Sequence, residues 1–400
     1  MPKTFQERVA KLGLGDPKTW PGEEIDALIT VNDIDRLKDI LDVGLPEAAR
    51  DAHMKALFEG VTVGSDRESR LLHRVHDYVF GNGTLSSEDR QLIGSAFPLE
   101  MEVKVAEDKT INTPVNLGTS TSPVIVNYGT LTMNQGGFLY VENTLLTLTV
   151  DTLVRNGNTG VSSAGDFNIM GLIGKTGTPG TTPGTPGQAQ SGAPGNCSSA
   201  GIAGSGGGNG STGATGTIGG PGGPGGDGLP SMPATITINK EIKLGTGVPQ
   251  IIVRTMSGPG GYGGPGGTGG TGGQGGNGGN GVTCGCTGNS GGSGGIGGTG
   301  GQGGNGGAGG NGVDAAGNVT VFVPAAEVNK IVPIGVPAQP GNGGGAGAGG
   351  SGGAGGGASS GGKHNSGGPA GGKGADGPQG SPGPRGTVTG KAAQVNVQPT

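Results

Sequence analysis

The chain has 400 residues, of which 100 are glycine, 13% are charged and only 3% are aromatic. Because glycine averages about 7% in proteins, most of this chain cannot build an ordinary hydrophobic core. The net charge of −5 and the scattered Lys and Arg residues argue against a nucleic-acid partner, and no apolar run is long enough to span a membrane.

Residues 1–96 are predicted to form a small α-helical domain. Apolar residues at helical spacing, such as Ile34, Leu37 and Ile40, follow a start signal at Asn32 or Asp33. A later apolar stripe ends at Gly81, and Ser86 or Ser87 can cap a last short helix.

Residues 97–156 are predicted to form a β-rich scaffold. The segment that starts at Met101 alternates apolar and charged residues, which is typical of a strand with one buried face. Further short β-like segments are separated by turns rich in Asn and Gly. This pattern predicts a β-solenoid or a β-sandwich, and the stretch resembles a right-handed β-helix.

From residue 157 onward, β-like segments alternate with long glycine-rich excursions. The β-like segments lie near 233–256, 318–336 and 387–398, and the excursions are 157–231, 257–317 and 338–388. Each excursion begins and ends at a β-like segment. We therefore expect the segments to add rungs to the 97–156 scaffold and the excursions to project from it.

Glycine recurs at every third residue through long parts of 157–388, for example from Gly201 to Gly228 and from Gly285 to Gly312. A three-residue period matches the left-handed polyproline-II helix, and Gly-Gly-X triplets clear two of its faces of side chains. Backbones cleared in this way can hydrogen-bond to one another. The pattern predicts a polyglycine-II helix bundle made of three hairpin excursions, with the Gly-Gly-X helices inside. A collagen trimer and a disordered segment are the alternative interpretations.

The Gly-Gly-X runs of 157–388 resemble those of known polyglycine-II proteins, namely the tail-fibre adhesins of some T4-like phages and the snow-flea antifreeze proteins. This resemblance implies a bundle fold. It also implies that the hairpin tips are receptor-contacting loops if the protein is an adhesin. The tips lack the aromatic residues expected of a sugar-binding site, and the antifreeze proteins have no counterpart of the N-terminal half.

The candidate site residues are Cys197, Cys284, Cys286 and His364, which all fall at the three predicted tips. Three thiols and one imidazole are a familiar zinc ligand set. Alternatively, Cys197 forms a disulfide with Cys284 or Cys286, or the four are ordinary turn residues. The tips near Cys197, Cys284 and His364 are also the candidate receptor-binding positions.

A second possible metal pair is His73 and His76 with Asp77 beside them, although buried or surface histidines are far commoner than ligands. No set of residues with the spacing of a catalytic triad or of paired acids stands out, so we expect no enzyme activity and no cofactor.

The function expected from these features is that of a non-catalytic structural protein, which self-assembles into a homo-oligomer, fibre or surface layer. An adhesin that binds a cell-surface receptor or glycan is the alternative, and an ice-binding protein is a minor one. The first residues lack the apolar core of a standard signal peptide. We therefore expect an extracellular, cell-surface or virion location reached by another route.

Overall fold

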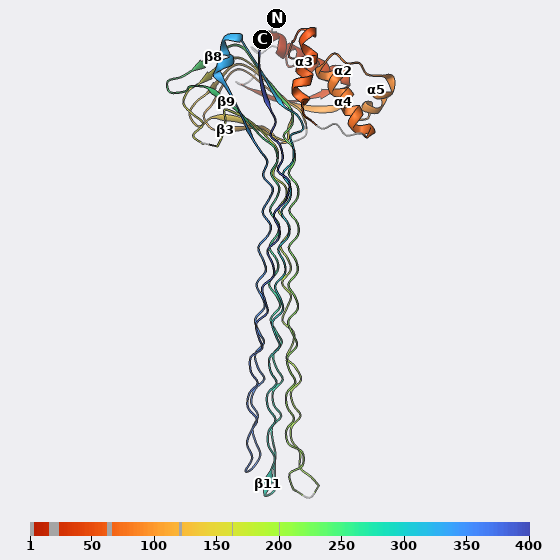
Figure 1. Ribbon diagram of the computed structural model, residues 1–400, viewed down its shortest axis with the longest axis vertical. Helices are drawn as coiled ribbons and strands as arrows, with labels where there is room; N and C mark the ends of the chain where they lie inside the picture. The colour runs from red at the N-terminus through yellow and green to blue at the C-terminus, as the bar shows by residue number, and fades with distance from the viewer. Residues whose placement is uncertain (1–3, 16–23, 62–65, 120–121, 162, 200) are drawn as a thin grey trace.

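A computed structural model describes residues 4–15, 24–61, 66–119, 122–161, 163–199 and 201–400. Figure 1 shows a head, made of helices and sheets, and a long narrow stalk that projects from it. The N-terminal helices lie on one side of the head, and the glycine-rich excursions make the stalk.

Two of the helices begin where the sequence signals place them. Asp33 caps one helix by accepting a hydrogen bond from the backbone N–H of Arg36, and Ser86 makes a capping box at another. The described helices are α1 (Phe5–Leu12), α2 (Ile34–Leu41), α3 (Glu47–Phe58), α4 (Arg67–Phe80) and α5 (Ser87–Gly94).

The purely helical prediction for residues 1–96 missed a strand. Residues Ile25–Val31 form β1, which pairs antiparallel with β2 (Leu99–Ile111) at the edge of a sheet. Its buried or half-buried residues alternate with exposed ones, as expected for a strand with one covered face. Val31 of β1 and Met101 of β2 share one buried apolar core with Ile34 of α2.

Two sheets make up the rest of the head. A seven-stranded sheet has the order β1-β2-β4-β6-β8-β12-β14 and is parallel except for β1, and a parallel five-stranded sheet has the order β13-β9-β7-β5-β3. The remaining strands of the first sheet are β4 (Val124–Met133), β6 (Leu146–Arg155), β8 (Ala234–Leu244), β12 (Val319–Val323) and β14 (Val395–Pro399). Those of the second are β3 (Pro114–Gly118), β5 (Phe138–Glu142), β7 (Phe167–Met170), β9 (Ile251–Met256) and β13 (Ile331–Val336). A short 3-10 helix, η2 (Ala325–Lys330), precedes β13.

From β2 onward, strands of the head that follow one another in the chain alternate between the two sheets. Both sheets contribute to one buried apolar core, which includes Val126 and Leu148 from the larger sheet and Phe167 and Val253 from the smaller one. Every predicted β-like segment after residue 97 contains strand residues, although in 387–398 the strand begins only at Val395. The architecture, however, is that of parallel α/β sheets, and the predicted β-solenoid or β-sandwich scaffold is wrong.

The stalk consists of six extended arms in three hairpins. We number them in chain order as arm 1 (171–195), arm 2 (204–229), arm 3 (258–281), arm 4 (289–313), arm 5 (338–362) and arm 6 (366–390). Backbone amides at every third residue donate to carbonyls of a neighbouring arm, as when Gly264 donates to Gly223 over 2.8 Å. These hydrogen bonds define two rows, arms 1, 3 and 5 and arms 2, 4 and 6. The arms of each row are parallel, and they are antiparallel to the arms of the other row.

The two rows continue the two sheets of the head. Strands β7, β9 and β13 of the smaller sheet run directly into arms 1, 3 and 5, and arms 2, 4 and 6 return into β8, β12 and β14 of the larger sheet. The order of the arms is therefore the order of the strands. This arrangement gives the stalk its register at the end where it leaves the head.

Glycine content follows position in the stalk. Arms 3 and 4, which consist mostly of Gly-Gly-X triplets, each hydrogen-bond to four other arms. Arms 1 and 6, with mostly one glycine per triplet, each hydrogen-bond to two. In arms 3 and 4 most glycines are buried and most X residues are exposed, because only a face without a Cβ can approach another backbone this closely.

The predicted fold class has to be corrected. The protein is an α/β protein with N-terminal helices, a mostly parallel seven-stranded sheet and a parallel five-stranded sheet. Within the described ranges no polyglycine-II helix is among its assigned elements, and the arms carry neither helix nor strand. A three-residue glycine period does not by itself specify a helix type. It specifies which backbone faces lack a Cβ and can approach a neighbour.

Candidate functional site at the distal end of the stalk

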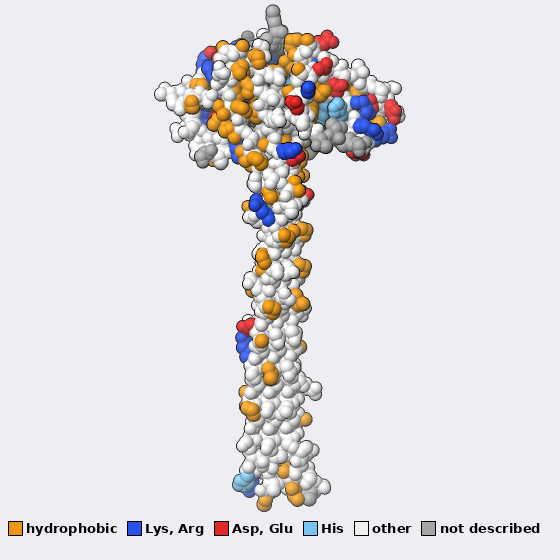
Figure 2. Space-filling model, viewed as in Figure 1, with side chains coloured by type: hydrophobic (Ala, Val, Ile, Leu, Met, Phe, Trp, Pro, Cys, Tyr) orange, Lys and Arg blue, Asp and Glu red, His pale blue; other side chains and the backbone are white. Residues whose placement is uncertain are grey.

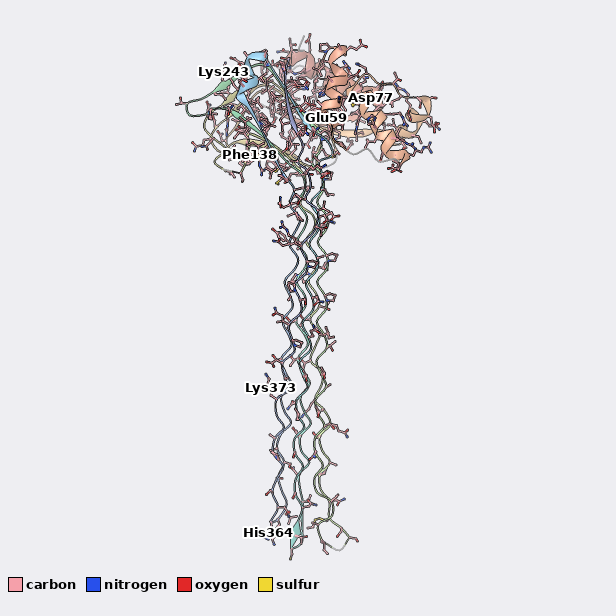
Figure 3. All side chains as sticks on the ribbon, in the orientation of Figure 1. Glu59, Asp77, Phe138, Lys243, His364 and Lys373 are labelled. Atoms are coloured by element: carbon pink, nitrogen blue, oxygen red, sulfur yellow. A yellow bond between two sulfur atoms is a disulfide. The ribbon has the colours of Figure 1, made fainter. Side chains whose placement is uncertain are left out.

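The three turns that connect the arms lie together at the end of the stalk far from the head. Figure 3 labels His364 at this end, and Figure 1 labels the short strand β11 (Thr287–Gly288) at the same end of the stalk. The four candidate residues Cys197, Cys284, Cys286 and His364 are all in these turns. We call these turns with the adjoining ends of the arms, residues 196–199, 201–205, 282–289 and 359–368, the distal tip.

A disulfide joins the first two turns. Cys197 is bonded to Cys284, with 5.6 Å between their Cα atoms, whereas Cys286 is free and exposed. Cys284 lies in the short strand β10 (Thr283–Cys284) and is buried, and Gly285 turns the chain so that Cys286 points outward. The bond therefore selects one of the two disulfides that the sequence left open.

The disulfide leaves the predicted zinc set incomplete. Two of its three thiols are oxidised, and a disulfide sulfur cannot act as a thiolate ligand. Among the residues that the structure describes, no group of three or more His, Cys, Asp or Glu side chains is placed to hold a metal ion.

Asn289 is the polar centre of the tip. Its buried amide Nδ2 donates to the carbonyl of Asn196 over 3.0 Å and to that of Ser205 over 2.6 Å, while its Oδ1 accepts from the N–H of Val282 over 2.7 Å. One side chain thus ties both ends of the first turn to the second. The disulfide and Asn289 together hold the first two turns in one place.

The third turn is held by side chains of its own and of the second turn. Thr283 accepts a hydrogen bond from the backbone N–H of Lys363 over 2.9 Å, and Asn365 donates to the carbonyl of Gly288 over 2.7 Å. His364, between them, has the left-handed backbone conformation with φ 65°. The side chains left exposed at the tip include Ile202 and Cys286, and no aromatic residue is among the residues of the tip.

The histidines of the head do not form the suspected metal pair. His76 stacks on Phe58 with 3.9 Å between ring centroids, and burial, with a smaller effect of the nearby His73, lowers its pKa to about 4. Sequence reasoning missed His53, which is buried between Phe80 and Phe322 and whose pKa burial also lowers to about 4. Both imidazoles are thus neutral packing groups at pH 7.

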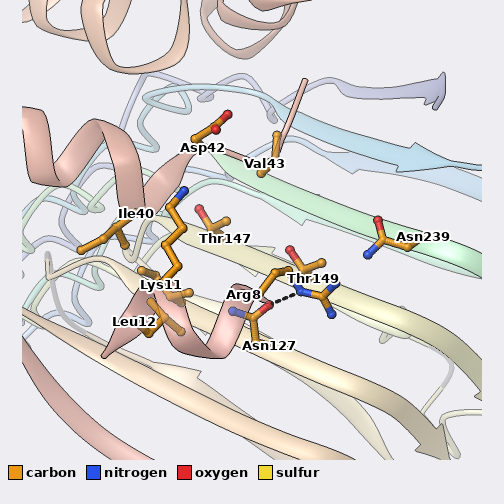
Figure 4. A pocket seen from close by; sticks show the side chains of 11 residues that line it. Arg8, Lys11, Leu12, Ile40, Asp42, Val43, Asn127, Thr147, Thr149 and Asn239 are labelled. Carbon is orange, nitrogen blue, oxygen red and sulfur yellow. Dashed lines mark hydrogen bonds between the residues drawn. The ribbon is translucent and has the colours of Figure 1, made fainter. Parts of the chain in front are cut away.

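Two pockets on the head, of about 230 Å³ and 190 Å³, bring no group of three metal-ligating side chains together among the described residues. The head also has smaller cavities. Figure 4 shows one between α1, the chain after α2 and the large sheet, where Arg8 donates to Asn127 over 2.9 Å and pairs with Asp151 over 2.9 Å. Its volume is about 40 Å³, which suits one or two waters rather than a substrate. Each charged group of its lining is in an ion pair, because Lys11 also contacts Asp39 and Asp42 contacts Arg50.

Sequence reasoning also missed the role of Asn and Asp along the stalk. Asn and Asp side chains at X positions accept hydrogen bonds from backbone amides of the neighbouring parallel arm. These amides take no part in the backbone hydrogen bonds between the arms. Examples are Asn280 with the N–H of Ser360 over 2.9 Å and Asn305 with the N–H of Ser381 over 2.9 Å. These hydrogen bonds have a constant sequence spacing, because Asn277 and Asn280 each accept a hydrogen bond from the residue 80 positions later. That spacing is the signal by which the sequence could have revealed them.

No family model, no curated protein and no solved structure matches this chain. The resemblance to the phage adhesins and antifreeze proteins is therefore not supported, because it rested on glycine spacing that unrelated sequences can share. No helix of the described residues is both long and apolar enough to span a membrane.

Proposed function

We propose that this protein is a non-catalytic structural subunit of an extracellular or virion-associated assembly, in which the stalk holds the distal tip at a fixed distance from the head. The observation that carries the proposal is the polarity of the molecule. The folded head lies at one end, and all three turns, joined by a disulfide and by Asn289, lie at the other.

The stalk has the features of a rigid spacer. Its arms have about 25 residues each, so its length cannot exceed roughly 90 Å for an extended backbone. Its inner arms bury glycine backbone and expose X residues that are mostly small or polar, with Tyr262 and Ile296 as exceptions. Charged side chains gather mainly on the head (Figure 2). A disulfide at the tip agrees with an oxidising compartment.

Arms 1 and 6, the outer arms of the stalk, carry prolines that disfavour lateral stacking of one stalk on another. Proline has no N–H, and its presence on the outer arms removes donors that another stalk could use. These residues are Pro179, Pro183, Pro186 and Pro194 of arm 1 and Pro369, Pro378, Pro382 and Pro384 of arm 6. We therefore favour separate stalks over a fibre in which the arms of many subunits stack.

Electron microscopy of the purified full-length chain tests this proposal. Deleting one triplet from each of the six arms, at matched positions, removes about 10 Å of extended backbone. We expect rods that each begin at one broad head and do not pack against other rods along their length, and rods that are shorter by this amount in the variant. Long sheets of laterally packed stalks, or a compact particle without a rod, would contradict the spacer.

An adhesin is the second candidate, because the exposed Ile202, Cys286 and His364 are presented where a stalk would deliver them to a surface. Replacing Ile202 and His364 with Ser leaves the disulfide and Asn289 in place. If the tip contacts a receptor, this variant loses binding to the target cell or glycan, while a change of the exposed Thr299 in mid-stalk does not. Equal binding by both variants would exclude a tip adhesin.

A further inference from the structure

The two sheets of the head have four edges, and three of them carry proline. Pro114 begins β3, Pro333 lies in the middle of β13 and Pro399 ends β14. β3 is further disturbed by a shift of register between Asn116 and Gly118. Proline and irregular register are the devices by which proteins prevent an exposed strand from pairing with another chain.

The fourth edge, β1, has none of these devices. Its sequence, Ile25 to Val31, contains no proline, glycine or lysine, and its seven residues pair with β2 in unbroken register. Within the described residues no strand pairs with its outer side. In the middle of the strand stands Leu28, 68% exposed, the most exposed of the large apolar side chains in the described part of the chain.

We infer that β1 is the self-association surface of the head, and that it pairs antiparallel with β1 of a second copy of this chain. The inference rests on the proposed function as a subunit of an assembly and names the surface that function would use. Full overlap of two antiparallel copies of β1 centres the two-fold axis on Leu28. Such an interface is isologous and closes at two copies.

The residues that would face each other are compatible at every position. Leu28 meets Leu28 of the second copy, which buries the exposed side chain, and Asp26, the only charged residue of the strand, meets Thr30. On the face towards the helices, Ala27 meets Ile29, and Ile25 meets Val31. No like charges are opposed, and apolar cross-strand pairs favour sheet pairing.

The charge on Asp26 is already balanced within its own chain. The ammonium group of Lys104 on β2 contacts the Asp26 carboxylate over 2.6 Å, directly across the β1–β2 pair. Pairing of β1 with a second copy therefore does not leave the Asp26 carboxylate without a partner. The dimer joins two seven-stranded sheets into one, and each head keeps its own stalk.

Sedimentation of the full-length chain gives the first test. We expect the wild type to sediment at twice the mass of the chain, and Leu28→Lys, which places a charge at the centre of the pair, to sediment as a monomer. Ile334→Lys on β13 is the matched control, because it changes an exposed apolar residue on an edge that already carries proline. A monomeric wild type, or a Leu28→Lys variant that remains dimeric with an unchanged melting curve, overturns the inference.

Cysteine cross-linking in a Cys286→Ser background tests the register. Directly opposed residues have Cβ atoms about 4.5–5.5 Å apart, which is near the reach of a disulfide. Leu28→Cys should then form a covalent dimer on mild oxidation, whereas Asp26→Cys should do so only when mixed with Thr30→Cys. A covalent dimer of Asp26→Cys alone overturns the register. Single unpaired rods in the electron microscope overturn the dimer but leave the spacer proposal standing.

Discussion

The close packing of glycine backbones in the stalk makes a prediction that can be worked out from one pair of residues. A Cβ on Gly301, in arm 4, would lie 2.6 Å from the carbonyl carbon of Thr217 in arm 2 and would overlap its carbonyl oxygen. A Cβ on Gly345, in arm 5, meets nothing within 4 Å. The same substitution, Gly to Ala, therefore meets opposite conditions at the two sites.

For Gly301→Ala, arms 2 and 4 must move apart locally. The nearest hydrogen bonds between them are those that Gly216 donates to Thr299 and Gly219 donates to Gln302, both 2.8 Å long. Two hydrogen bonds at about 0.5–1.5 kcal/mol each, and one or two buried groups left unpaired at about 1–3 kcal/mol each, give a loss of about 2–5 kcal/mol. For Gly345→Ala we expect a change between zero and a gain of about 1 kcal/mol, because alanine has fewer unfolded conformations.

Hydrogen exchange of stalk peptides, followed by mass spectrometry, measures this difference. A loss of 2 kcal/mol speeds exchange by about 30-fold where the amides open locally, since each 1.4 kcal/mol is a factor of ten. We expect that acceleration in arms 2 and 4 for Gly301→Ala and none in arm 5 for Gly345→Ala. Equal exchange in the two variants would refute the idea that direct contact between backbones holds the stalk together.

Three further predictions concern the head and the tip. Because burial lowers the pKa of His53 from 6.5 to about 4, the unfolded chain binds the proton first, and the head should lose up to about 3 kcal/mol as pH falls from 6.5 to 4. His53→Leu should remove the His53 share of that slope in denaturant titrations, while His76, whose pKa burial also lowers to about 4, keeps its own share. An unchanged slope would contradict the assignment. Asp166→Asn should cost about 3–5 kcal/mol in the same assay, because it leaves the buried guanidinium of Arg155 without its counter-ion, while Glu88→Gln in an exposed pair should have no measurable effect. Cys197→Ser should speed exchange at the tip but not beside the head; the lost cross-link spans 87 residues and is worth about 4–5 kcal/mol in the chain-entropy description. Unchanged exchange at the tip would mean that Asn289 alone holds the turns.

The positions of the strands could be predicted from the sequence much better than the pairing of one strand with another. The apolar alternation that starts at Met101 and the apolar segments near 233–256 and 318–336 are all strands, because side-chain patterning is a local property. The pairing of β8 with β12 joins residues separated by an 85-residue interval that includes two arms, as Ala234 with Val319, and no local pattern specifies it. The β-helix interpretation failed at this step, when local strands were assembled into a global architecture.

The position of the distal tip could be predicted because it follows from a local sequence pattern. Its internal contacts could not be predicted because they join residues that are distant in the sequence. The glycine register breaks near Cys197, Cys284 and His364, so three turns could be placed there. Which thiol pairs with Cys197 depends on the direction of each side chain around Gly285, and that direction follows from a turn conformation the pattern does not encode. Asn289 could not be recognised at all, since one more Asn in a glycine-rich segment carries no distinguishing signal.

The sheets of the head set the register in which the arms of the stalk align. Ordering a glycine backbone costs about 1–2 kcal/mol per residue, and a hydrogen bond between arms returns about 0.5–1.5 kcal/mol, so an isolated pair of arms should not hold its alignment. The sheets of the head supply this alignment. Val319 of β12 pairs with Val395 of β14, and Asn305 of arm 4 accepts from Ser381 of arm 6 at the same spacing of 76 residues.

The spacing of the other row is carried over in the same way. Ile251 of β9 pairs with Ile331 of β13, and Asn280 of arm 3 accepts from Ser360 of arm 5, again at one spacing, 80 residues. The strands thus fix the spacing between paired residues, because a change of register there would move buried apolar side chains out of the core. The arms keep the same spacing as far as the tip, mainly through backbone hydrogen bonds. A slip of one triplet in a single arm would have to be absorbed either in the core of the head or at the disulfide, which is why the two ends of the stalk are its most strongly constrained parts.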